Sequence, residues 1–385
     1  MEALSTCLAA GLAGFLGGSF LQEQRKNFML EGIANPGALT ETEILSEPRC
    51  WKECLQVLEG NDEIGPFLDR SASFPEWLFI GCGSSYYVAQ SAARSWTAIT
   101  GLRAHAIPAS ELLFFPELIL RDNAAVQPVL ISRSGTTSEI LKAAEYLHSA
   151  GIRTLAISCS PGQKLEDLAT TTLCLAPADE ASTVMTRSFT SMLIGLQFLA
   201  ARRATKPKFA ESLQRLADGS QAILEPMAGR IREFAEFHSF SDFVFLGQGP
   251  FYGLACEGAL KVQEMSCSYS QSFHTLEFRH GPKSIVSPET LICFLLSEKG
   301  NSAERELLEE VKGLGGSTLA ICNHADSKIR GSADLLIEIQ LEIEEIARLA
   351  AFVLPCQLLG LYTGLKKGHD PDRPKNLSRV VVLND

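Results

Sequence analysis

A loop rich in hydroxyl groups is the first stretch of this chain that could do chemistry. Residues 132–138 hold five serine or threonine side chains and Arg133, directly after the apolar run 129–131. The stretch that starts at Glu139 is amphipathic, so the sequence predicts a strand, a loop and a helix. A helix start presents unpaired N–H groups to an anion, and the hydroxyl groups add donors, so this loop suits a phosphate. An ordinary capped turn is the alternative, since serine and threonine cap helices widely.

Three charged residues farther along the chain have the spacing of one helical face. Glu257, Lys261 and Glu264 follow one another at intervals of four and three residues. One of the glutamates could act as a general base, with its pKa raised by partial burial and tuned by the lysine. A solvent-exposed face with salt bridges is the alternative.

A histidine and a further hydroxyl-bearing segment complete the candidates. His280 stands beside Gly281-Pro282, so it lies in a turn that could direct its imidazole into a cleft. A surface position is the alternative for a lone loop histidine. Thr183 belongs to a segment that precedes a predicted helix, where a cap is the alternative. The other histidines show no arrangement that suggests a metal site, and we expect no metal or cofactor.

The composition limits the class of protein. The 385 residues are 46% hydrophobic and 21% charged, which is typical of a globular protein large enough for two domains. The net charge of −11 argues against a nucleic-acid partner. Eleven cysteines without a C-x-x-C motif fit a reducing, cytoplasmic compartment. The apolar stretch 8–20 is too short to span a bilayer, so we expect no membrane partner.

The pattern of the chain predicts a duplicated α/β domain. Thr40, with Glu43 three residues later, predicts a capping box at the start of a helical lead-in over 40–70. Short apolar runs then alternate with amphipathic segments, which favours parallel sheets. Residues 79–89 match residues 245–255 at an offset of 166, and residues 154–157 recur as 318–321. Two matches in the same order indicate an internal repeat, although Glu298 stands in the second copy where the first has Arg133 and would repel an anion.

These stretches together resemble the sugar isomerase (SIS) superfamily, in the tandem form found in the isomerase half of glucosamine-6-phosphate synthase and in AgaS-type isomerases. The resemblance covers about residues 40–385. It rests on Gly-Cys-Gly-Ser-Ser at 81–85, Ile-Ser-Arg-Ser-Gly-Thr-Thr at 131–137, Glu-Gly-Ala-Leu-Lys-Val-Gln-Glu at 257–264, Phe-Arg-His-Gly-Pro-Lys-Ser at 278–284 and Arg-Pro-Lys-Asn-Leu-Ser-Arg at 373–379. The fold it implies is α/β, with two tandem flavodoxin-like SIS domains, each a parallel sheet flanked by helices.

The resemblance also implies a role for each candidate residue. The sugar phosphate would be bound by Ser85, Ser132, Ser134 and Thr137, with Arg133 beside it. Thr183 and Arg379 would bind other parts of the substrate. Glu264 would move a proton between C1 and C2, Lys261 would steady that carboxylate or the developing charge, and His280 would assist ring opening from the neighbouring subunit of a homodimer.

The expected domains are an N-terminal extension over 1–39, a first SIS domain over 40–205, a second over 206–365 and a C-terminal tail over 366–385 that closes the site. No glutaminase-like segment stands ahead of residue 40, and Arg379 stands where the synthase has a Schiff-base lysine, so amide transfer from glutamine is not expected. The sequence therefore predicts an isomerase or deaminase of a hexose or hexosamine 6-phosphate, of gluco or galacto configuration. A sugar-phosphate-binding regulator without catalysis is the alternative.

Overall fold

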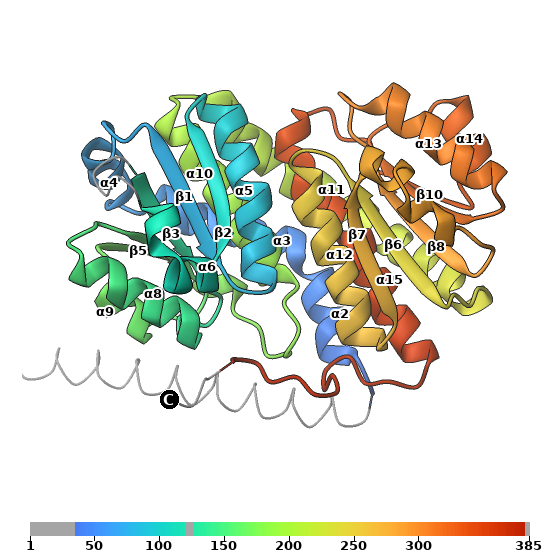
Figure 1. Ribbon diagram of the computed structural model, residues 1–385, viewed down its shortest axis with the longest axis horizontal. Coiled ribbons are helices and arrows are strands. Elements are labelled where there is room, and N and C mark those ends of the chain that lie inside the picture. The colour runs from blue at the N-terminus through green and yellow to red at the C-terminus, as the bar shows by residue number, and fades with distance from the viewer. Residues whose placement is uncertain (1–34, 121–125, 382–385) are drawn as a thin grey trace, which may run out of the picture.

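The computed structural model describes residues 35–120 and 126–381, which form two α/β lobes side by side (Figure 1). Each lobe contains a five-stranded sheet in which every neighbouring pair of strands is parallel. Helices cover both faces of such a sheet, so its inner strands are apolar throughout. The apolar stretch 8–20 lies outside the described residues.

The first sheet has the strand order β2-β1-β3-β4-β5. Its strands are β1 (Glu76–Gly81), β2 (Arg103–Pro108), β3 (Val126–Ile131), β4 (Leu155–Ser158) and β5 (Thr171–Cys174). The helices in this half of the sequence are α2 (Ala38–Leu45), which packs against α15 (Leu349–Lys366) of the second lobe, α3 (Glu47–Glu59), α4 (Ile64–Arg70), α5 (Ser84–Thr100), α6 (Ala109–Phe114), α7 (Pro116–Ile119), α8 (Ser138–Ser149), α9 (Lys164–Leu168), η1 (Ala176–Ala178) and α10 (Arg187–Arg203).

The second sheet follows the same path, with the order β7-β6-β8-β9-β10. Its strands are β6 (Asp242–Gly247), β7 (Tyr269–His274), β8 (Thr290–Leu295), β9 (Ser317–Cys322) and β10 (Leu335–Glu338). The helices of this half are α11 (Pro207–Phe237), α12 (Phe251–Ser266), η2 (Thr275–Arg279), η3 (Pro282–Ile285), α13 (Asn301–Gly313), α14 (Ser327–Ser332), η4 (Glu345–Arg348) and α15 (Leu349–Lys366). The shared order confirms the predicted repeat of a flavodoxin-like sheet.

The two glycine loops have the same backbone geometry in both halves. A Cβ atom on Gly81 would lie 2.4 Å from the backbone of Ser85, and one on Gly247 would lie 2.4 Å from the backbone of Phe251. Gly83 and Gly249 have φ angles of 54° and 57°, a region that glycine adopts without strain. The matched glycines are therefore required by a tight turn from a strand into a helix, once in each lobe.

Helices α5 and α12, which follow these turns, pack against each other between the lobes (Figure 1). Gly253 of α12 permits the contact, because a Cβ there would lie 2.4 Å from Ser91 Oγ of α5. In the described residues one stretch, Glu345–Lys366, is apolar and long enough to cross a bilayer, and its apolar part is 94% buried inside the protein. This stretch, which contains α15, is thus a core element.

Helix α2 begins differently from the prediction of a local capping box. Its N-cap residue is Gly37, and Thr40 donates its N–H and hydroxyl to the carboxylate of Asp372, at 2.8 and 2.7 Å. Glu43 instead accepts a hydrogen bond from Ala181 N at 2.6 Å. The predicted cap is wrong because the C-terminal segment supplies the acceptor.

Candidate active site

A pocket of about 290 Å³ lies where the carboxyl ends of the first sheet meet the second lobe and the C-terminal segment. Four parts of the chain contribute to its wall: the loop after β1, the loop after β3 with the start of α8, the segment after β5, and residues 377–381. Helix α12 adds one carboxylate, that of Glu264. The lining residues are Cys82, Gly83, Ser84, Ser85, Arg133, Ser134, Thr137, Glu139, Thr183, Met185, Glu264, Leu377, Ser378, Arg379, Val380 and Val381.

Seven of the ten residues singled out from the sequence line this pocket. They are Ser85, Arg133, Ser134, Thr137, Thr183, Glu264 and Arg379. Two others lie behind the wall. Ser132 is buried and accepts a hydrogen bond from Gly135 N at 3.2 Å, and Lys261 is buried behind Glu264. His280 is exposed at the end of η2 and does not line the pocket of its own chain.

The hydroxyl loop meets the pocket at the start of α8. Thr137 is the N-cap residue of this helix, and its side chain caps no N–H group. Ser134 Oγ accepts from Thr136 N and Thr136 Oγ1, at 3.2 and 3.1 Å, which fixes the loop. Ser138 N donates to the carbonyl of Val381 at 3.3 Å, so the C-terminal segment touches the same helix end. The hydroxyl groups of this loop and the N-terminal end of α8 thus lie on one wall of the pocket, which is the kind of place where an anion binds.

The three charged residues of α12 form a buried ion cluster. Lys261 Nζ lies 3.0 Å from Glu257 Oε1 and 2.5 Å from Glu264 Oε2. The side chains of Glu257 and Lys261 are fully buried, whereas that of Glu264 is 19% exposed and reaches the pocket. The alternative of a solvent-exposed face is therefore wrong. One carboxylate faces the cavity, and the lysine behind it holds it in place.

The cluster changes the protonation of its own members. Burial raises the pKa of Glu257 to about 7, against the lowering effect of Lys261. Burial alone would lower the pKa of Lys261, but the two carboxylates outweigh it and raise that pKa. The lysine consequently stays charged and compensates the carboxylates around it.

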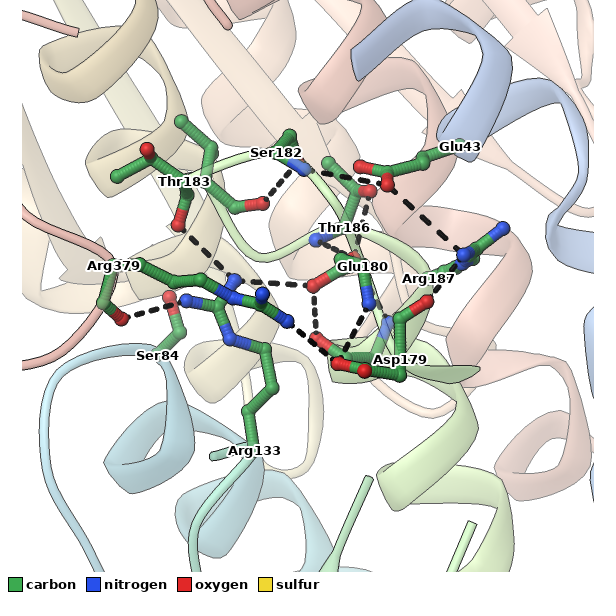
Figure 2. A network of polar contacts seen from close by, with 12 residues as sticks. Glu43, Ser84, Arg133, Asp179, Glu180, Ser182, Thr183, Thr186, Arg187 and Arg379 are labelled. Atoms are coloured by element: carbon green, nitrogen blue, oxygen red, sulfur yellow. Dashed lines mark hydrogen bonds and ion pairs between the residues drawn. The ribbon is translucent and has the colours of Figure 1, made fainter. Parts of the chain in front are cut away.

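Arg133 extends from the hydroxyl loop into the segment after β5 (Figure 2). One of its nitrogens, Nη1, donates to Glu180 Oε2 at 3.2 Å and to the carbonyl of Thr183 at 3.0 Å. The other, Nη2, donates to the carbonyl of Arg379 at 2.8 Å. The guanidinium of Arg379 pairs with Asp179 Oδ1 at 2.6 Å. These contacts join the loop, the segment after β5 and the C-terminal segment.

Sequence reasoning missed two polar residues of this site. Ser84 lines the pocket and donates to Glu257 Oε1, and the signal that could have found it is the Gly-Cys-Gly-Ser-Ser stretch, from which the sequence predicts only its neighbour Ser85. Glu180 has no motif around it, and only the tertiary fold brings it to Arg133. Across residues 35–120 and 126–381 no group of three or more His, Cys, Asp or Glu side chains is placed to hold a metal ion.

Comparison with known proteins defines the family. The sequence profile of the SIS domain matches residues 76–202 and 238–362, which is well over half of the chain. The chain therefore belongs to the SIS domain family. The two matched segments contain the two sheets described above, so each lobe is one SIS domain.

Individual relatives carry several activities on this fold. Glucosamine-6-phosphate deaminase from Thermotoga maritima is 30% identical, with a TM-score of 0.73, over 89% of this chain and all of that one. Tagatose-6-phosphate ketose/aldose isomerase from Escherichia coli has a TM-score of 0.80 at 23% identity, over 91% of this chain and 97% of that one, which shows a shared fold. The glutamine–fructose-6-phosphate aminotransferase of Methanothermobacter thermautotrophicus is 29% identical over 361 residues, 93% of this chain and 58% of that protein. The chain spans about half the length of the curated relatives it matches.

Proposed function

We propose that this chain is an aldose–ketose isomerase or amino-sugar deaminase that acts on a hexose or hexosamine 6-phosphate. One observation carries the proposal: the carboxylate of Glu264 lines the same pocket as the donors of Ser134 and Thr137. A sugar phosphate can then bind through its remote phosphate while C1 and C2 face a base. The pocket volume of about 290 Å³ is close to the lower end of small-ligand sites.

In the proposed reaction Glu264 removes a proton from one of the two carbons and returns it to the other, through an enediol. For an amino sugar the same transfer gives a ketimine, and water hydrolyses its C=N bond to a ketose and ammonia. Lys261 lies behind Glu264 and does not line the pocket, so we assign it a positioning role. Its ammonium group holds the Glu264 carboxylate in place at the pocket wall.

A panel of glucosamine-, galactosamine-, glucose-, fructose- and tagatose-6-phosphate tests the proposal, with assays for ammonia and for the isomerised sugar. We expect turnover of at least one of these sugars. Glu264→Gln should lower kcat by about 10³-fold while ligand binding, followed by thermal shift, survives. Glu225→Gln, on the exposed face of α11, is the control and should leave kcat unchanged.

Two outcomes would count against the proposal in different ways. Binding without turnover of any sugar would make the chain a sugar-phosphate sensor. Unchanged turnover in Glu264→Gln would show that another group is the base.

The position of His280 outside its own pocket supports a homodimer in which the partner lends this imidazole. Complementation tests this. Glu264→Gln and His280→Ala subunits are mixed in equal amounts and allowed to re-assemble into dimers. If His280 acts across the interface, one of the two sites in each mixed dimer has both groups intact, which is about a quarter of all sites. If His280 acts within its own chain, both variants and their mixture should be inactive. If His280 takes no part, His280→Ala should be active by itself and mixing should add no activity.

A further inference from the structure

The described contacts of Arg133 are directed at the protein. Its side chain is only 6% exposed, and its two terminal nitrogens donate to one carboxylate and two backbone carbonyls. Those carbonyls belong to Thr183 and Arg379, on the two segments that cover the pocket beside the hydroxyl loop (Figure 2). A guanidinium presents five N–H donors in a planar fork, which suits it to hold several acceptors in one fixed arrangement.

Glu180 is built to orient this guanidinium. Its side chain is fully buried and accepts hydrogen bonds from the N–H and the hydroxyl of both Thr186 and Ser188, between 2.6 and 3.1 Å. Burial by itself would raise the pKa of Glu180, but Arg133 and these donors together lower it. The carboxylate is therefore a charged, rigidly held anchor at the start of α10.

The second lobe has a corresponding ion pair with its charges exchanged, and its loop-side residue, Glu298, is 56% exposed where Arg133 is 6% exposed. Glu298 occupies the loop position of Arg133, as shown by Ser297 Oγ, which accepts from Gly300 N at 2.9 Å as Ser132 Oγ does from Gly135 N. Glu298 forms an ion pair with Arg348, in the segment after the fifth strand of that sheet. Arg348 also donates to a backbone carbonyl of that segment, Leu341 O, at 2.9 Å.

In both lobes, then, an ion pair joins the loop after the third strand in sequence to the segment after the fifth. In the second lobe the residue at the loop position is a glutamate, Glu298, and its carboxylate would repel a phosphate. The two halves therefore share an ion pair that joins the loop after the third strand to the segment after the fifth. Binding of an anionic ligand is not needed to explain why a charged residue stands at this loop position.

We propose that Arg133 is a positioning residue: its ion pair with Glu180 fastens the Thr183 segment and the C-terminal segment over the pocket. The sugar phosphate is then bound by the neutral donors of the hydroxyl loop and the start of α8. This inference rests on the proposed function only for the identity of the ligand. The contacts by which Arg133 holds the two segments are present in the free protein.

The first experiment measures hydrogen–deuterium exchange of residues 373–381 in the full chain without ligand. Glu180→Gln and Arg133→Gln should each speed exchange there by at least about tenfold, because the segment loses a tether. Glu304→Gln is the matched control: Glu304 is also buried and accepts from Ser297 N and Oγ, but in the other lobe, and exchange of 373–381 should stay at the parent rate. Unchanged exchange in Arg133→Gln would overturn the proposal.

The second experiment titrates inorganic phosphate into the parent and Arg133→Gln and follows binding by calorimetry. A positioning role predicts that the dissociation constant changes by at most about threefold, whereas loss of a direct charged contact would weaken binding by tenfold or more. The larger loss would overturn the proposal. If Glu180→Gln does not fold, Arg133→Gln alone still decides the question. Failure of the parent to bind phosphate would count against the proposed function, and the exchange experiment would still test the fastening.

Discussion

The hydroxyl of Ser84, in the first lobe, lies 3.1 Å from Glu257 Oε1 and 3.2 Å from Lys261 Nζ, both in the second lobe. The glycine loop after β1 is thereby hydrogen-bonded to the ion cluster that holds Glu264. The geometry of the candidate base thus depends on how α5 and α12 pack. A site built from both lobes is sensitive to changes far from the substrate.

Ser84→Ala and its neighbour Ser85→Ala should separate stability from binding. Both serines are buried and line the pocket, but only Ser84 is also hydrogen-bonded to Glu257 and Lys261 of the ion cluster. Ser84→Ala should lower the free energy of unfolding by about 2 kcal/mol, because it leaves buried charged groups with one partner fewer. Ser85→Ala should weaken sugar-phosphate binding and change stability less. Denaturant unfolding and ligand titration of both variants check this; equal stability losses would contradict it.

Lys261→Met should destabilise the protein in a pH-dependent way. Removing the cation leaves Glu257 and Glu264 without their shared partner, and breaking such a buried cluster costs about 4 kcal/mol. The pKa of Glu257 should rise further, so the loss should be larger at pH 8 than at pH 6. Urea unfolding at both pH values measures it. Lys52→Met, which breaks an exposed ion pair with Asp218, should cost less than about 1 kcal/mol at either pH.

Glu304 should make the protein less stable as the pH rises toward neutrality. Burial raises its pKa from the ordinary value of 4.5 to about 7. The folded state therefore holds a proton that the unfolded state releases between these values, and the free energy of unfolding should fall by up to about 3 kcal/mol across that interval. Glu304→Gln should remove this decline. Unfolding titrations from pH 4.5 to 8 check the sign, and parallel curves for parent and variant would refute it.

Asp372→Ala should loosen both ends of the described chain. Its carboxylate accepts from Leu39 N and from Thr40 N and Oγ1, so it caps α2 from the C-terminal segment. Loss of a cap costs about 1 kcal/mol, and here it also frees the segment that covers the pocket. We expect a lower free energy of unfolding and a raised KM. Asp326→Ala removes a cap from α14 within one lobe, so it should leave KM unchanged.

The sequence by itself determined the elements and their repetition. Glycines at 81, 83, 247 and 249 are required by tight turns wherever they occur, and apolar runs between amphipathic segments predict parallel sheets without knowledge of the rest of the chain. The one-face spacing of Glu257, Lys261 and Glu264 also follows from helical geometry alone. These are local properties, so they can be read from neighbouring residues.

Only the tertiary structure decided which groups face each other across long separations. Burial of Glu257 and Lys261 depends on the packing of α12 against α5 and α15, the cap of α2 comes from Asp372, and the partner of Arg133 is Glu180. In the sequence Arg133 is an arginine within a loop of serine and threonine residues. This pattern is the same whether the guanidinium binds a ligand or pairs with a buried carboxylate. Charge and hydrogen-bonding partners are chosen by distance in space, which the spacing of residues along the chain does not specify.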